Sequence, residues 1–498
     1  MKNYFLPFLL VFGFAITFAQ SEKEKVESTV NKSTIEGHIY FLADDLLKGR
    51  ETGTPENKIA AAYLANTLRS YGVKPNPKTG TFYQDVLLKK VSPPESIVLS
   101  INGETMNDKA IIEPNKIAYE GTAVYLNYGL AADYVGKDVK DKVVILKAGS
   151  DAAKDARAAF GLLKEKRQLA IDAGVKAVIE LLPAEEQMWG FIEHNFNTSS
   201  LQVANDKTDK TDTTDDLAYV WVKDTGAKMG TALATEKKID IKLNISDKKE
   251  ESIVSQNVIG IVEGTDPNLK NEYIIYSAHY DHVGIGTPDE TGDTIYNGAR
   301  DNAVGTTTVL SMAENLAKYP TKRSALFILF TGEEKGLLGS QYYVDNPVLP
   351  LHQMVYCFNS DNAGYNDTSL ATIVGLSRTT AAKHITEAAT QFGITAVDDP
   401  APEQGLFDRS DNVHFAAKGI PAPTFSLGFT AFNGDVTKYY HRPGDEAETL
   451  DYDYLFKFFK AYVLSGRNIA NDPATPTWTK GDKYEEASNK LYNRMDKN

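Results

Sequence analysis

One short stretch of the chain combines a histidine with carboxylates in a way that is typical of a metal site. Residues 276–282 read YSAHYDH, and the apolar run 273–276 leads into them and predicts a buried strand. His279 and Asp281 then fall at the carboxyl end of that strand, where open α/β sheets present functional residues. Asp301 follows, just before an amphipathic helical pattern. This stretch alone fits a metal site and a hydrogen-bonded histidine beside two solvated acids equally well.

Two more predicted strands lead into acids, and a late loop adds a second histidine. The apolar runs are residues 325–330 and 354–358, and the loop is residues 439–445. Taken singly, a glutamate pair is typical of a solvated turn, and an aspartate after a strand is often a helix cap. Successive strand ends converge on one rim of a sheet, however, so together these side chains favour a shared site. They are Glu333, Glu334, Asp361 and His441.

This inventory suits a centre with two zinc ions. Two metals about 3.5–4 Å apart can clamp a carbonyl and an attacking hydroxide. Such a pair needs a shared carboxylate and further histidine and carboxylate ligands. It also needs a nearby carboxylate that takes the proton of the water. Glu333 and Glu334 are adjacent and point in different directions, so one can ligate while the other acts as base.

These motifs resemble the M28 family of zinc aminopeptidases. Further matching segments are LADDLLKGR at residues 42–50, GLLGS at 336–340, RSD at 409–411 and GIPA at 419–422. The resemblance implies two Zn²⁺ ions bridged by Asp301, with His279 and Asp361 completing one site and Glu334 and His441 the other. It also implies Glu333 as the general base, Asp281 as the residue that orients His279, and Tyr440 as a group that steadies the oxyanion.

Some positions near the expected specificity pocket depart from the family pattern. Asn362 follows the predicted ligand Asp361 where an apolar residue is usual, and Asn412 stands where many members have histidine. His282 is adjacent to the predicted site and is a candidate lining residue. Asp408, Arg409 and Asp411 resemble pocket residues, although loop salt bridges are an equal alternative.

The resemblance implies an α/β fold with a mixed, mostly parallel central sheet flanked by helices. Beyond residue 250 strands and helices alternate, and residues 115–247 form a β-rich block with one histidine, His194. That block resembles a protease-associated (PA) domain inserted into the peptidase. The predicted organisation is a signal peptide at 1–19, peptidase segments at 20–114 and 248–475, the PA-like insertion at 115–247, and a polar C-terminal tail at 476–498.

Composition restricts the class of protein. A chain of 498 residues predicts two or more domains, and 42% hydrophobic with 24% charged residues is ordinary for a globular protein. The net charge of −14 argues against nucleic acid as a partner. Lys2, the apolar run 5–18 and the small residues around Ala19 predict a cleaved signal peptide and export to the periplasm or beyond the cell. No later run predicts a stable membrane anchor. The single cysteine, Cys357, excludes an internal disulfide.

Three alternatives to a secreted aminopeptidase acting on peptides stay open. One is a related enzyme, carboxypeptidase-like or glutaminyl-cyclase-like. Another is a non-catalytic, receptor-like protein on the same fold. The third is a binding module in which the PA-like block dominates. The preferred N-terminal residue, the role of that block, the compartment and the oligomeric state are not determined by the sequence.

Overall fold

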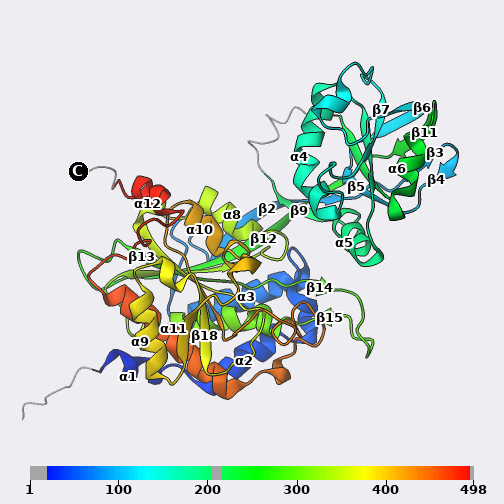
Figure 1. Ribbon diagram of the computed structural model, residues 1–498. Helices are drawn as coiled ribbons and strands as arrows, with labels where there is room; N and C mark the ends of the chain where they lie inside the picture. Colours follow the sequence, from blue (N-terminus) through cyan, green and yellow to red (C-terminus); the bar gives the residue numbers. More distant parts are fainter. Residues whose placement is uncertain (1–19, 205–215, 494–498) are drawn as a thin grey trace, which may run out of the picture. The chain divides into compact units, whose positions relative to one another are not determined.

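The computed structural model describes residues 20–204 and 216–493 and divides the chain into two compact units (Figure 1). Unit 1 comprises the residues up to Val86 and from Ser255 onward, and unit 2 is Leu87–Val254. The predicted signal peptide lies outside the described residues. The predicted insertion 115–247 lies within unit 2, which begins earlier and ends later. Among the described residues, no helix has both the length and the apolar character needed to cross a membrane.

The sheet of unit 1 is mixed, and its centre is parallel. β13 lies between β16 and β17 and runs parallel to both. β12 pairs antiparallel with β16, and β18 pairs antiparallel with β20. The strand order in unit 1 is β19-β18-β20-β17-β13-β16-β12, with β1 beside β12. The strands are β1 (Lys74–Pro75), β12 (Lys249–Val262), β13 (Tyr273–His279), β16 (Ser324–Phe330), β17 (Met354–Ser360), β18 (Leu370–Val374), β19 (Thr395–Asp398), β20 (Thr424–Leu427) and the small hairpin β14 (Gly284–Ile285) with β15 (Ile295–Tyr296).

Helices cover both faces of this sheet. Every residue of β16 is buried, and alternate residues enter different clusters because successive side chains of a strand point to opposite faces. Phe327 packs in a cluster with Phe458 of α11, whereas Phe330 packs with Tyr343 of α8 and Phe415 of α10. The predicted α/β class is therefore confirmed. The helices are α1 (Glu22–Glu27), α2 (Lys32–Leu42), α3 (Pro55–Ser70), α7 (Gly305–Lys318), α8 (Leu338–Asp345), α9 (Ala382–Gln391), α10 (Asn412–Ala417), α11 (Tyr452–Asn471) and α12 (Glu485–Leu491).

Two segments of unit 1 differ from their sequence patterns. The apolar residues of the segment 34–47 are spaced as in a single helix, but α2 ends at Leu42. The chain then turns tightly through Asp45–Arg50, where Lys48, Gly49 and Arg50 have positive φ angles. The polar C-terminal segment contains α12. Trp478 anchors this segment to unit 1, because its side chain is 4% exposed and packs in the apolar cluster that contains Phe415.

Unit 2 has its own eight-stranded sheet, in the order β4-β3-β11-β6-β7-β8-β10-β5. β11 alternates between buried and exposed residues, as its sequence predicts, whereas β8 is buried throughout. β2 (Tyr83–Ser92) and β12 carry the chain from one unit to the other, and β9 (Ser200–Val203) pairs with β2. The remaining elements are β3 (Ile97–Ile101), β4 (Glu104–Thr105), β5 (Lys109–Glu113), β6 (Ile117–Tyr125), β7 (Val143–Lys147), β8 (Ala177–Leu182), β10 (Ala218–Lys223), β11 (Ile239–Ile245), α4 (Ala156–Asp172), α5 (Glu186–Phe196) and α6 (Lys228–Leu233).

Candidate metal centre

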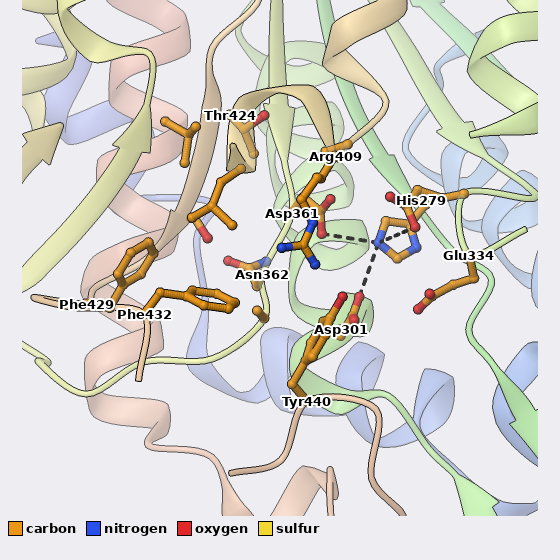
Figure 2. A pocket seen from close by; sticks show the side chains of 16 residues that line it. His279, Asp301, Glu334, Asp361, Asn362, Arg409, Thr424, Phe429, Phe432 and Tyr440 are labelled. Carbon is orange, nitrogen blue, oxygen red and sulfur yellow. Dashed lines mark hydrogen bonds and ion pairs between the residues drawn. The ribbon is translucent and has the colours of Figure 1, made fainter. Parts of the chain in front are cut away.

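The predicted site residues meet at the carboxyl ends of the three central strands. His279 is the last residue of β13, and Asp361 directly follows β17. Glu333 and Glu334 follow β16 after a two-residue turn. Because β13 is parallel to both neighbours, all three strand ends lie on one rim. Figure 2 shows His279, Asp301, Glu334, Asp361 and Tyr440 around one pocket.

Asp301 stands between two sets of potential ligand atoms. Its Oδ1 lies 3.2 Å from Nε2 of His279, which is also 3.2 Å from Oδ1 of Asp361. Its Oδ2 lies 3.3 Å from Nε2 of His441, which is 3.1 Å from Oε2 of Glu334. One carboxylate thus faces a His279–Asp361 pair with one oxygen and a Glu334–His441 pair with the other.

The side chains of the four acids in this cluster are only 5–18% exposed, and the basic groups paired with them are histidines. Burial disfavours the His279 cation, but Glu333 and Asp361 outweigh it and raise the pKa of His279 well above its ordinary value. Burial also disfavours a charged Asp301, yet hydrogen bonds with His279 and His441 lower the pKa of that carboxyl. Asp301 and Glu334 raise the pKa of His441 to about 10 against the effect of burial.

Glu333 differs from its neighbour Glu334. Burial and the charges of Asp361 and Glu334 raise the pKa of Glu333 well above its ordinary value, despite the opposing effect of His279. Burial and Asp301 also raise the pKa of Glu334, but His282 and His441 outweigh them and bring it to about 2. Two adjacent carboxyls therefore differ in proton affinity, a difference that is typical of the acid and base groups of active sites.

The carboxylate of Asp281 contacts the turn that carries the two glutamates. It accepts hydrogen bonds from the backbone N–H groups of Glu333 and Glu334, at 3.2 and 3.3 Å, and from the Thr52 hydroxyl at 2.8 Å. Its nearest oxygen lies 3.9 Å from Nδ1 of His279. That Nδ1 lies 3.1 Å from the backbone carbonyl of Asp281, so the main chain of this residue orients the imidazole.

Two buried arginines support the loops around Asp301, and sequence reasoning did not single out their contacts. Asp445 accepts from the Arg300 guanidinium at 2.9 Å and from the backbone N–H of Asp301 at 3.2 Å. Arg50 is 1% exposed and donates to the carbonyls of Tyr280, Leu42, Asn297 and Gly298. For Arg50, the only signal in the sequence is its place at the end of the family-like segment LADDLLKGR, residues 42–50.

One side of the pocket is polar and the other is apolar. Beyond Tyr440, whose ring stacks on His441 at 4.0 Å between centroids, the wall contains apolar side chains. Arg409 lines the pocket, whereas Asp408 forms an ion pair with Lys483 at 2.9 Å. Asp411 is fully buried, and burial raises its pKa to about 7. The apolar lining residues are Val374, Leu406, Phe429 and Phe432.

Three overlapping groups of side chains in this cluster could hold a metal ion. In each group the potential ligand atoms lie within 4.8 Å of one another; the groups are His279, Asp301 and Asp361; His282, Asp301, Glu334 and His441; and His279, Glu333 and Glu334. Imidazole nitrogens with carboxylate oxygens are the ligands that zinc takes in catalytic sites. Bound cations would also compensate the buried negative charge.

Known proteins resemble this chain in sequence. Residues 257–465 match the model of peptidase family M28. The aminopeptidase YwaD of Bacillus subtilis (strain 168) is 32% identical over 232 residues, which are 45% of this chain and 46% of that protein. Leucine aminopeptidase 2 of Trichophyton rubrum is 25% identical over 286 residues, 52% of this chain and 54% of that protein. The chain spans about half the length of the curated relatives it matches.

Solved structures show the same fold. The aminopeptidase from Aneurinibacillus sp. strain AM-1 has a TM-score of 0.60 at 21% identity, with 92% of this chain and 98% of that chain covered. BSAP, a zinc aminopeptidase from Bacillus subtilis, has a TM-score of 0.52 at 21% identity, with 92% and 97% covered. The chain thus shares its fold with these two aminopeptidase structures.

Proposed function

We propose that this chain is a zinc-dependent aminopeptidase that removes N-terminal residues from peptides, since residues 257–465 match the model of peptidase family M28. The observation that carries the proposal is the position of Asp301. One of its oxygens lies 3.2 Å from His279 and the other lies 3.3 Å from His441. Each histidine is also close to a second carboxylate, Asp361 for His279 and Glu334 for His441. The curated relatives named as aminopeptidases support the same conclusion.

Two zinc ions would be held by five side chains. Asp301 would bridge them, His279 and Asp361 would complete one site, and Glu334 and His441 would complete the other. Bound there, the metals would polarise the scissile carbonyl and increase the acidity of the attacking water.

Glu333 is the proposed general base. Its side chain is 10% exposed, and its Oε2 lies 4.0 Å from Nε2 of His279 without belonging to either set of three proposed ligands. Its raised pKa suits a carboxylate that takes a proton from water and then gives that proton to the leaving amine. The hydroxyl of Tyr440 would donate to the oxygen on which negative charge develops, and burial keeps it protonated by raising its pKa.

The rest of the pocket supports a substrate with an apolar first residue. Phe429 and Phe432 stand on the wall away from the metal ligands, as Figure 2 shows. Such a wall would accept the first side chain while the free amine lies toward the carboxylates. Within this proposal, residues 115–247 form a PA-like insertion and residues 1–19 direct export.

Chromogenic aminoacyl substrates test the proposal. We expect hydrolysis of leucyl and phenylalanyl substrates, loss of activity with a chelator, and recovery with zinc. Asp301→Asn should lose both metals by elemental analysis.

N-acetylated substrates should be inert; their hydrolysis, or cyclisation of an N-terminal glutamine, would favour the carboxypeptidase-like or glutaminyl-cyclase-like alternative. A metal-loaded chain that turns over no substrate would favour the receptor-like alternative. Deleting residues 115–247 and measuring dipeptide hydrolysis tests whether the insertion contributes.

A further inference from the structure

His282 contacts the metal centre but has no part in the proposed reaction. We propose that His282 is a positioning residue, which holds Glu334 by a hydrogen bond and thereby sets the metal affinity of the Glu334–His441 site. This inference rests on the proposed two-zinc centre, and it concerns only one of its two sites.

The contact divides the Glu334 carboxylate between two histidines. Nδ1 of His282 lies 2.7 Å from Oε1 of Glu334, while Oε2 of Glu334 lies 3.1 Å from Nε2 of His441. The His282 side chain is 0% exposed and that of Glu334 is 5% exposed, so water does not compete for this bond. With Oε1 held, Oε2 is directed toward His441 and Asp301. Such outer hydrogen bonds orient metal ligands and strengthen binding.

The distances favour His282 as a hydrogen-bond donor to Glu334 over His282 as a sixth metal ligand. A 2.7 Å separation between Nδ1 and Oε1 is that of a direct hydrogen bond and leaves no room for an ion between the two atoms. Nε2 is buried and has no hydrogen-bond partner within residues 20–204 and 216–493. With Nδ1 as the donor to Glu334, the imidazole makes the one hydrogen bond that these surroundings offer.

The surroundings of the imidazole fix its place. A Cβ atom added to Gly298 would lie 2.6 Å from Cγ and Cδ2 of His282, so the ring fills the space beside this glycine. The backbone of His282 forms a parallel bridge with Glu51. Arg50 donates to the carbonyl of Gly298 at 3.1 Å and to that of Tyr280 at 2.8 Å. These bonds connect the two backbone segments that lie on either side of the His282 ring. His282 is thus held rigidly enough to orient Glu334.

Three substitutions of His282 distinguish the contribution of its hydrogen bond from that of the packing of its ring. His282→Ala removes both, and His282→Leu removes the donor but keeps a buried side chain, which protects the test if the alanine variant does not fold. His282→Asn keeps a donor, because its amide nitrogen can take the place of Nδ1. Competition with a chromophoric chelator gives the two zinc affinities of the full-length protein separately.

We expect His282→Ala and His282→Leu to weaken one zinc site by about 10- to 100-fold and to leave the other unchanged. His282→Asn should restore that site to within a few-fold of the unsubstituted protein. His38→Ala is the matched control, since His38 is also buried in unit 1 but is bonded to the hydroxyls of Tyr63 and Tyr71, at 2.7 and 2.9 Å. This control should keep both affinities.

Unchanged zinc binding in both the alanine and leucine variants would overturn the positioning role. Equal losses in the asparagine and leucine variants would also overturn it, because the hydrogen bond would then not be the operative feature. Failure of the proposed function looks different, since the unsubstituted protein would then not bind two zinc ions at all.

Discussion

Each unit of this protein buries a cluster of charged side chains, but the two clusters are built differently. In unit 2, Glu180 of β8 accepts from Lys166 Nζ at 2.5 Å, from Trp221 Nε1 at 2.7 Å and from the Tyr219 hydroxyl at 2.9 Å. Both charged side chains are 0% exposed. This cluster contains one negative and one positive charge, and donors surround the carboxylate.

The cluster of unit 1 is not balanced in this way. Four carboxyl groups meet there, and the basic side chains within about 3.3 Å of them are histidines, with no lysine or arginine among these pairs. Burying unpaired charge is costly, and the cost is relieved either by a bound cation or by protonation of one of the acids. A balanced buried network is typical of a structural role, whereas an unbalanced one with shifted pKa values is typical of a functional site.

The largest expected effect is the loss of turnover in Glu333→Gln, which changes the unbalanced cluster of unit 1. Without the proton acceptor, turnover of a leucyl substrate should fall by about a thousandfold, equivalent to about 4 kcal/mol in the barrier. Zinc content and the thermal midpoint should stay as they are, since the variant removes a carboxyl whose charge burial already disfavours. Near-normal turnover would show that Glu333 is not the base.

Lys166→Met makes the opposite change in unit 2. The charge of Glu180 is left buried without its partner, which should lower the free energy of unfolding by about 3–5 kcal/mol. Turnover per folded molecule should not change. Denaturant unfolding followed by tryptophan fluorescence measures this, because two of the three tryptophans, Trp189 and Trp221, belong to unit 2. A loss of activity without a loss of stability would mean that this cluster is more than structural.

The double variant Lys166→Met/Glu180→Gln gives the smallest expected effect. Its glutamine keeps an acceptor for Tyr219 and Trp221 and carries no charge, so stability should return to within about 1 kcal/mol of the unsubstituted protein. A double variant as unstable as Lys166→Met alone would show that lost packing, and not unpaired charge, causes the effect. Charge balance would then not be what distinguishes the Lys166–Glu180 cluster from the cluster of unit 1.

Much of the framework that carries the site follows from local sequence. The apolar runs 273–276, 325–330 and 354–358 predict three buried strands, which the structure shows as β13, β16 and β17. Their polar continuations place His279, Glu333, Glu334 and Asp361 on one rim, because parallel neighbouring strands end at the same edge. The positions of these residues at strand ends therefore indicated that they lie close together, whereas the ligand roles of Asp301 and His441 came from the resemblance to the family.

The contacts between particular atoms required the tertiary structure. Asp281 is two residues from His279 in sequence, but its carboxylate accepts from the backbone of Glu333 and Glu334. His282 gives no sign in the sequence that its Nδ1 faces Glu334. The buried pair of Lys166 and Glu180 lies in a segment whose pattern indicates only a helix and a strand.

The sequence by itself determined which elements form and which residues stand at their ends, since periodicity and turn residues act over a few positions. The tertiary structure decided which oxygen or nitrogen of each side chain faces which neighbour. That depends on strand register and on loops joined across long separations, as when Asp445 holds the backbone of Asp301. No local period encodes such a contact, and for that reason the balance of charge in each unit became visible only in the folded chain.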